Sequence, residues 1–325
     1  EDAPQYHIIC AGSLLGVALS RHTSFPVGKV DFLDMYPLNF YEFLDALGET
    51  SLRELLQQGN WVLAESFASR YKELLRSYYF VGGMPEAVAV YAQSQDLVEV
   101  RNIQKKILLA YEQDFAKHAP NDIVPRIRML WNSIPAQLAK ENKKFVYGII
   151  REGARAKDYE LVLTWLADCG LVKQVFRVSK PALPLKAYED FGAFKLFMVD
   201  VGLLGAMTNL DAVTLLEGDR VFQEFKGALT EQYVSQQLTT LEDLTVNYWS
   251  AENGRAEIDF LVQSRNVIIP IEVKAEENLR AKSLQVFCQK FEPPLAIRTS
   301  MSNYRQENWM TNLPLYAILS VNTQN

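Results

Sequence analysis

Hydrophobic residues recur at helical spacing through most of the first third of the chain. The segments LRELLQQ and WVLAESFASRYKELLRSYYF show this period, and an aromatic-rich connector, FLDMYPLNFYEF, precedes them. Such a period predicts amphipathic helices over most of residues 14–120. Gly82, Gly83 and Pro85 predict a turn that leads into a helix with proline in its first turn. A long helix with a polar face is expected over about 96–118.

A different pattern opens the chain. Residues 8–11 form a short apolar run ended by Gly12 and Ser13, which predicts a strand buried on both faces. A buried parallel strand needs neighbouring strands, and the sequence offers no earlier ones. Because the first residue is also not methionine, we expect the sequence to be the C-terminal part of a longer protein.

Residues 122–221 contain three predicted helices followed by two strand-like segments, VKQVFRV and FKLFMVD. The last of these helices, over 157–168, is amphipathic, with Leu161 among the side chains expected to point inward and Gly170 as its C-terminal cap. Three helices followed by a β-hairpin are the element order of a winged helix-turn-helix. We therefore predict a winged-helix domain over residues 122–221.

The charge of this middle region differs from that of the whole chain. Between Asp122 and Lys180 there are eleven Lys or Arg against six Asp or Glu, a local charge of +5 in a chain of net charge −6. Such a basic surface is expected to contact phosphates. The cations near the presumed recognition helix are Lys140, Lys143, Lys144, Arg151, Arg155 and Lys157. We predict that they contact duplex DNA; the alternative is the solvated face of a protein–protein adaptor.

Two strand patterns, EIDFLV over 257–262 and VIIPIEVK over 267–274, flank a turn at Ser264 and Arg265. A turn centred there pairs residue 262 with 267, 260 with 269 and 258 with 271. One face of this hairpin is then wholly apolar and must be buried. A slip by one residue would expose that apolar set, so hydrophobicity specifies which side chains share a face.

The same pairing gathers Glu257, Asp259, Glu272 and Lys274 on the opposite, polar face. Asp259 lies diagonal to Glu272, and such neighbours are about 7–8 Å apart at Cα, so their carboxylates can converge on one ion. Carboxylate oxygens and water are the ligands that Mg²⁺ prefers. The ion would polarise a phosphate and activate a water molecule, which Lys274 would orient. A third carboxylate is expected from Glu231, in the helical segment GALTEQYVSQQLTTL.

An Asp on one strand and Glu-x-Lys on the next resemble the PD-(D/E)xK nuclease core. The resemblance implies a restriction-endonuclease-like α/β module over residues 222–325, with Asp259, Glu272, Lys274 and Glu231 as catalytic residues and Mg²⁺ at Asp259 and Glu272. From residue 222 onward, however, nine basic residues stand against twelve acidic ones, which disfavours polyanion binding. The alternative is a degenerate nuclease fold whose acids are solvent-exposed or paired with basic residues.

Five motifs, in order, resemble prokaryotic AAA-type ATPases that end in a domain of unknown function, DUF4143. They are AGSLLG, VDFLDMYPLNFYEFL, GGMPEAV, FKLFMVDVGLLGA and the pair AEIDFLV…IIPIEVKA, and they span essentially the whole chain. The resemblance implies that residues 1–121 are the C-terminal part of the AAA core, with a helical lid around 76–88, and that Ser13 senses the γ-phosphate. The sequence contains no G-x-x-x-x-G-K-[S/T] loop, so binding of ATP and Mg²⁺ is expected of the intact protein.

The expected fold class is therefore multidomain α/β, with an AAA core and lid, a winged helix and a nuclease-like module. The first predicted function is an ATP-driven switch that couples the winged helix and the nuclease-like module to DNA. The alternatives are a non-catalytic protein-interaction module, with a protein partner or a second copy of the chain, and a Mg²⁺-dependent nuclease regulated by the ATPase. Three distant cysteines predict reduced thiols in the cytoplasm, and no apolar run approaches the roughly 18 residues of a membrane helix.

Overall fold

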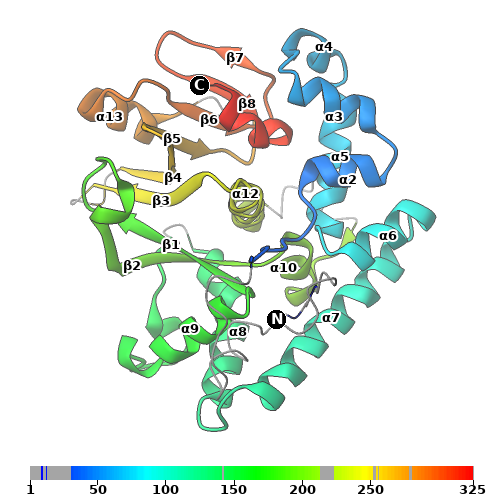
Figure 1. Cartoon of the computed structure of the whole chain (residues 1–325), viewed down its shortest axis with the longest axis vertical. Coiled ribbons are helices and arrows are strands. Elements are labelled where there is room, and N and C mark those ends of the chain that lie inside the picture. Colours follow the sequence, from blue (N-terminus) through cyan, green and yellow to red (C-terminus); the bar gives the residue numbers. More distant parts are fainter. Residues whose placement is uncertain are drawn as a thin grey trace, which may run out of the picture.

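The computed structural model of the protein describes residues 31–140, 143–212, 223–251, 254, 256–277 and 280–324, together with Ile9 and Gly12. Ser13 and most of the strand predicted over 8–11 lie outside the described residues. The described helices surround one eight-stranded mixed sheet (Figure 1). This arrangement confirms the mixed α/β class.

The N-terminal part of the described chain is helical, as its hydrophobic period predicts. Its helices are α2 (Phe40–Ala46), α3 (Thr50–Gln57), α4 (Trp61–Ser66), α5 (Ala68–Val81), α6 (Pro85–Ser94) and α7 (Leu97–His118). Gly82, at φ 73°, ends α5, and Pro85 occupies the first turn of α6. Asp96 caps α7 by accepting the backbone N–H groups of Val98 and Glu99. The turn and both predicted helix starts are thus confirmed.

The next part contains α8 (Val124–Leu138), two 3₁₀ turns (Tyr147–Ile149 and Ala156–Asp158), α9 (Glu160–Asp168), β1 (Val172–Val178) and β2 (Glu189–Met198). β1 and β2 form the expected antiparallel hairpin, and the N–H of Phe145 donates to the carbonyl of Phe194 at 2.7 Å. Gly170, at φ 69°, follows α9 as predicted. The inward position of Leu161 is wrong, because α9 buries the face of Val162, Leu163 and Leu166 and leaves Leu161 72% exposed.

The remaining elements are α10 (Val201–Met207), α12 (Gln223–Thr239), β3 (Leu244–Ser250), β4 (Glu257–Ser264), β5 (Val267–Val273), α13 (Lys282–Phe291), β6 (Ile297–Ser300), β7 (Arg305–Gln306), β8 (Thr311–Pro314) and a 3₁₀ segment (Leu315–Gln324). The sheet order is β2-β1-β3-β4-β5-β6-β8-β7. β1 pairs in parallel with β3. The sheet therefore runs without a break across the predicted boundary between 221 and 222.

Two hydrophobic clusters cover opposite faces of the C-terminal half of the sheet. The larger contains Leu229, Tyr233 and Leu238 of α12, packed against alternate residues of β4 and β5 such as Phe260 and Ile271. The smaller contains Leu284 and Phe287 of α13, packed against Ile258, Leu261 and Trp249. Because successive strand residues point to opposite faces, α12 and α13 sandwich the sheet between them.

The hairpin of β4 and β5 differs from the prediction in its register. Val262 faces Ile269 and Ser264 faces Val267, so the turn consists of Arg265 and Asn266 and the predicted pairing is wrong by two residues. Arg265 takes φ 51°, which a tight two-residue turn requires. A shift by two leaves the facing of side chains unchanged. Val262 and Ile269 accordingly share the α12 face, as the apolar pattern predicts.

A bulge in β4 changes the facing of its first residues. Asn247 of β3 faces Leu261, whereas Trp249 faces Ile258, so β4 has one residue more than β3 over this stretch. A bulge of this kind reverses the alternation of side chains on either side of it. Ile258 consequently packs under α13 and not beside Phe260, which corrects the predicted apolar face.

The GGMPEAV and FKLFMVDVGLLGA motifs meet at a tight backbone junction. A Cβ on Gly83 would lie 2.1 Å from the carbonyl oxygen of Leu38, and one on Gly202 would lie 2.5 Å from that of Val81. The carboxylate of Asp200 accepts the N–H of Gly83 at 2.7 Å and caps α10 through the N–H of Leu203. Glycine is therefore required at both positions because two backbones touch there.

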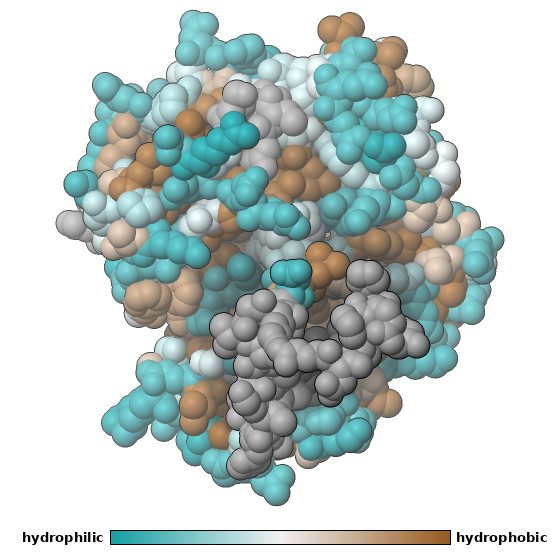
Figure 2. Space-filling model, viewed as in Figure 1, coloured by the Kyte–Doolittle hydropathy of each residue, from teal (hydrophilic) through white to brown (hydrophobic). Residues whose placement is uncertain are grey.

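Helix α4 packs on the connection between β6 and β7. Trp61 stacks on Tyr304 with ring centroids 4.7 Å apart, and Asn303 donates to Glu65 at 2.8 Å. Figure 2 shows hydrophobic side chains at the tip of this helix, where Val62 is 85% exposed. The N-terminal helices thus contact the end of the chain as well as its middle.

Candidate functional site

Helix α12 (Gln223–Thr239) carries several polar residues that are buried in the fold. Glu231, Gln232, Gln236 and Gln237 are each at most 8% exposed. The amide of Gln232 both accepts from the N–H and donates to the carbonyl of Met198, at 2.8 and 2.6 Å. The side-chain amide of Gln232 thus satisfies both backbone groups of Met198, as the backbone of a neighbouring strand would.

Gln236 and Gln237 extend this row towards the N-terminal helices. Gln236 accepts the N–H of Val201 at 2.9 Å and donates to Asp200 at 3.0 Å. Gln237 accepts the N–H of Phe40 at 2.7 Å, and both glutamines donate to the hydroxyl of Tyr78. Helix α12 is therefore joined by hydrogen bonds to β2, α10, α5 and α2.

Lys195 of β2 lies at the centre of a buried charge cluster, which we define as Lys143, Lys195, Glu231, Glu257 and Asp259. Its Nζ is 2.7 Å from Glu257, 3.5 Å from Glu231 and 3.7 Å from Asp259, and its side chain is 1% exposed. Lys143 pairs with the other oxygen of Glu231 at 2.5 Å. Three carboxylates thus converge, but they converge on an ammonium group.

Burial and the close charges of the cluster shift the pKa values of several of its members. Burial lowers the pKa of Lys195, but the carboxylates of Glu231, Glu257 and Asp259 outweigh it and hold that pKa well above its ordinary value. Burial and the neighbouring charge of Glu231 raise the pKa of Asp259 to about 7, against the opposing effect of Lys195. Burial would raise the pKa of Glu231 too, yet Lys195 and Lys143 bring it below its ordinary value. Lys195 and Glu231 are therefore charged, and Asp259 gains a proton most readily.

Glu272 lies on the opposite face of the sheet. Its carboxylate accepts the N–H of Leu284 in the first turn of α13 at 3.0 Å and pairs with Lys274 at 2.7 Å. Asp259 instead accepts the N–H of Val273 at 2.8 Å and faces Lys195. The predicted convergence of Asp259 and Glu272 on one face is wrong, because the bulge in β4 turns Asp259 towards α12.

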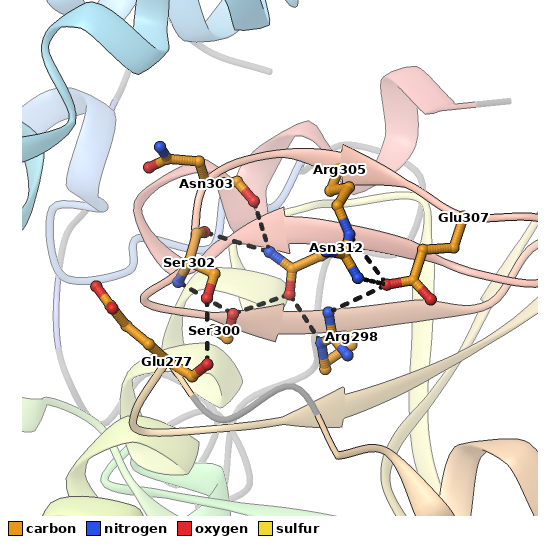
Figure 3. A network of polar contacts seen from close by, with 8 residues as sticks. All are labelled: Glu277, Arg298, Ser300, Ser302, Asn303, Arg305, Glu307 and Asn312. Carbon is orange, nitrogen blue, oxygen red and sulfur yellow. Dashed lines mark hydrogen bonds and ion pairs between the residues drawn. The ribbon is translucent and has the colours of Figure 1, made fainter.

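A second polar network joins β6, β8 and the connection between β6 and β7 (Figure 3). Arg298 of β6 is paired in register with Glu272 and with Asn312 of β8, and its Nε donates to the side chain of Asn312 at 2.9 Å. Asn312 also accepts from Ser300 at 2.8 Å and donates to the carbonyl of Asn303 at 2.9 Å. These contacts fix the connection between β6 and β7.

The residues predicted to bind Mg²⁺ do not fit that ion. In the described part of the chain, no three His, Cys, Asp or Glu side chains are placed to hold a metal. Glu231, Glu257 and Asp259 have suitable oxygen donors, but the ammonium of Lys195 lies among them. Glu272 uses its two oxygens on Lys274 and α13.

The six cations predicted to contact DNA fall into two groups. Lys143 is buried in the charge cluster, and Lys140 is half-buried with its Nζ bonded to the carbonyl of Lys144 at 2.6 Å. Lys144, Arg151, Arg155 and Lys157 are exposed. Lys143 is therefore removed from any DNA surface, whereas these four remain available to solvent.

The presumed recognition helix α9 does not carry these cations. Its exposed side chains are Glu160, Leu161, Thr164 and Asp168, with Arg151, Arg155 and Lys157 in the segment that precedes it. A helix face with two carboxylates would repel the phosphates beside a major groove. Phosphates would therefore contact the segment that precedes α9 and not the exposed face of α9.

The sequence contained unused signals for the charge cluster. Lys195 is the single charged residue in the apolar strand AFKLFMV, and a lone lysine in a buried strand needs a partner. The polar residues Glu231, Gln232, Gln236 and Gln237 lie among apolar residues all round one helix, so a fold that buries this helix must give them partners. Both signals indicate buried polar contacts.

Comparison with family models divides the chain into two matched segments. Residues 72–214 match a domain of unknown function, DUF8612, and residues 226–318 match a domain of unknown function, DUF4143. Comparison with curated proteins and with solved structures gave no match. Among the described residues, no helix combines the length and apolarity needed to cross a bilayer. The C-terminal part of the chain is thus a DUF4143 domain, as the sequence predicts, and Lys195 joins the DUF8612 segment to it.

Proposed function

We propose that this chain is a non-catalytic coupling module that contacts nucleic acid, and not a metal-dependent nuclease. The observation that carries the proposal is the position of Lys195, whose ammonium lies 2.7 Å from Glu257 and within 4 Å of Glu231 and Asp259. A fixed internal cation neutralises the acids that a nuclease would use for Mg²⁺. With Glu272 on the other face, Asp259 and Glu272 cannot share one metal ion.

Coupling is supported by the way α12 joins the two matched segments. Its buried glutamines bond to backbone or side-chain groups of α2, α5, β2 and α10, and the sheet continues from β1 into β3. Movement of either segment would therefore move the other. By its resemblance, the intact protein would drive such movement with ATP, as an ATP-driven switch. Ser13, the residue assigned to the γ-phosphate, lies outside the described residues.

Nucleic-acid contact is supported by the element order between 124 and 198. Helix α8, a short strand-like segment bonded to β2, α9 and the β1–β2 hairpin follow one another as in a winged helix. Lys144, Arg151, Arg155 and Lys157 are exposed beside this unit. We propose that they bind the phosphates of duplex DNA.

The nuclease alternative is tested by incubating plasmid and linear DNA with the full chain and Mg²⁺ or Mn²⁺, beside Asp259→Asn. We expect no cleavage by either protein and no binding of Mn²⁺ in electron paramagnetic resonance. Metal-dependent cleavage by the native chain that Asp259→Asn abolishes would refute the non-catalytic assignment.

DNA contact is tested by the salt dependence of duplex binding in the triple variant Arg151→Ala, Arg155→Ala, Lys157→Ala. Each lost phosphate contact lowers the slope of log K against log salt by about 0.9. The control is Lys105→Ala with Lys106→Ala, two exposed lysines on α7. Equal slopes in both variants, or no duplex binding at low salt, would contradict the proposed surface.

A further inference from the structure

Helix α7, 22 residues long, lies at the rim of the molecule and turns one face to solvent (Figure 1). Its other face packs on α5, α6, α8 and α10 and contains the buried residues Val100, Ile103, Gln104 and Phe115. The amide of Gln104 donates to the carbonyls of Phe80 and Val81 at 2.8 and 2.9 Å. Because the inner face is anchored in this way, a partner that approaches the outer face meets a preformed surface.

The solvent face of α7 carries a narrow line of apolar and uncharged side chains. Val98 is 72% exposed and Leu109 is 57% exposed. Three further exposed residues, Asn102, Gln113 and Ala116, lie on the same line. At about 100° per residue, all five fall within about 60° of one another around the helix axis, which is the geometry of a seam between two paired helices. We call these five residues the α7 seam.

Charged side chains flank the α7 seam on both sides. Glu99 and Lys117 lie on one flank, and Lys105 and Glu112 lie on the other. Glu112 is half-buried and the other three are exposed, and none of the four forms an ion pair with another described residue. Ion pairs within a helix join residues three or four positions apart, so neither flank can neutralise its own charges.

The order of these residues is complementary to an antiparallel copy of the same helix. In an antiparallel pair related by a twofold axis, each flank meets the same flank of the other copy, and every contact occurs twice. The facing pairs are then Glu99 with Lys117, Lys105 with Glu112, and Asn102 with Gln113. All three pairs are centred within one residue of Leu108, so a single axis satisfies them together. The same axis brings Leu109 beside the Leu109 of the copy.

We infer that α7 is the contact surface of a homodimer, in which the α7 helices of two copies pair in antiparallel orientation through the α7 seam. The self-complementary order of charges favours a second copy over an unrelated protein. One pair of helices buries less than the roughly 1,200–2,000 Å² of a standard interface, so we expect a dissociation constant on the order of 10–100 μM. The dimer goes beyond the proposed function and does not depend on nucleic-acid contact.

The test is sedimentation velocity of the full chain at low salt, at concentrations up to about 300 μM. An acidic variant carries Lys105→Glu with Lys117→Glu, and a basic variant carries Glu99→Lys with Glu112→Lys. Each variant alone places like charges opposite one another, so we expect it to remain monomeric. An equimolar mixture should form dimers again, because every charged pair across the axis is then one of opposite sign.

The matched control is Lys173→Glu with Lys282→Glu, two exposed lysines on β1 and α13. It changes the net charge as much as the acidic variant does and should leave the dimer intact. Cross-linking gives a second measurement that alters no charge. A short bis-maleimide should join Leu109→Cys to its copy. Val98→Cys, about 30 Å from its copy along the helix axis, should give only the background of the native cysteines.

A native chain that stays monomeric at about 300 μM would overturn the assignment. Dimers that persist in the acidic and basic variants, or that disappear in the control variant, would also overturn it. A mixture that remains monomeric, or equal cross-linking at positions 98 and 109, would refute the antiparallel pairing. Loss of duplex binding in the triple variant with an unchanged dimer would concern the proposed function alone.

Discussion

Replacing Lys195 with methionine tests the buried charge cluster directly. The substitution keeps most of the side-chain volume but removes the ammonium that lies 2.7 Å from Glu257, 3.5 Å from Glu231 and 3.7 Å from Asp259. Removing one partner of a buried ion pair costs about 3–5 kcal/mol, because it leaves an uncompensated charge. Since a domain is stable by about 5–15 kcal/mol, we expect Lys195→Met to lose a large share of the free energy of unfolding.

The loss of unfolding free energy in Lys195→Met should depend on pH. Lys195 lowers the pKa of Glu231 and of Asp259, so without it burial raises the folded pKa of both carboxyls above their unfolded values of about 4. The folded variant then binds more protons than the unfolded chain as the pH passes through this interval, so its stability falls with rising pH. Urea unfolding followed by tryptophan fluorescence should therefore show a larger deficit at pH 8 than at pH 5.

The matched control is Lys226→Met, which removes an amine 2.5 Å from Glu276 at the surface. Exposed pairs contribute about 0–1 kcal/mol, so this variant should unfold near the native midpoint. Adding Asp259→Asn to Lys195→Met should recover part of the loss at pH 8. An unchanged urea midpoint and slope for Lys195→Met at pH 8 would refute the assignment of a paired, buried cluster.

Four further substitutions can be tested by urea unfolding. Gly83→Ala should destabilise by at least about 1–3 kcal/mol, because its Cβ would meet the carbonyl of Leu38 at 2.1 Å, whereas Gly227→Ala on α12, with open space around its Cβ, should stabilise by about 0.5–1 kcal/mol. Gln236→Leu removes three buried hydrogen bonds, leaves the N–H of Val201 without its acceptor and should cost at least about 1–3 kcal/mol; a native midpoint would contradict the glutamine contacts. Asp259→Asn should flatten the decline of native stability between about pH 4 and 7, because the folded pKa of about 7 exceeds the unfolded one.

The hydrophobic pattern predicted most of the elements and their faces. Helical spacing located α5, α6 and α7, and the alternation in EIDFLV and VIIPIEVK located the β4–β5 hairpin. These predictions hold because each depends on residues close in sequence. The pairing of β1 with β3 depends on contacts some seventy residues apart, which no local pattern encodes.

The polar site was harder to predict than the fold around it. A perfect alternation through β4 would place Asp259 and Glu272 together, and a single inserted residue opposite Tyr248 separates them. Nothing in the strand sequence marks that insertion, since Ile258, Phe260 and Leu261 are all apolar. Lys143 was likewise assigned to DNA contact without Glu231, the partner that only the folded chain brings to it.

The glutamine contacts of α12 have a practical consequence for dividing this protein. A cut between residues 214 and 226 would follow the gap between the two family matches, yet it would separate Lys195 from Glu231 and Met198 from Gln232. Each fragment would expose polar groups that are paired with groups of the other fragment in the intact chain. The pieces should associate when mixed, and either one alone should be prone to precipitate.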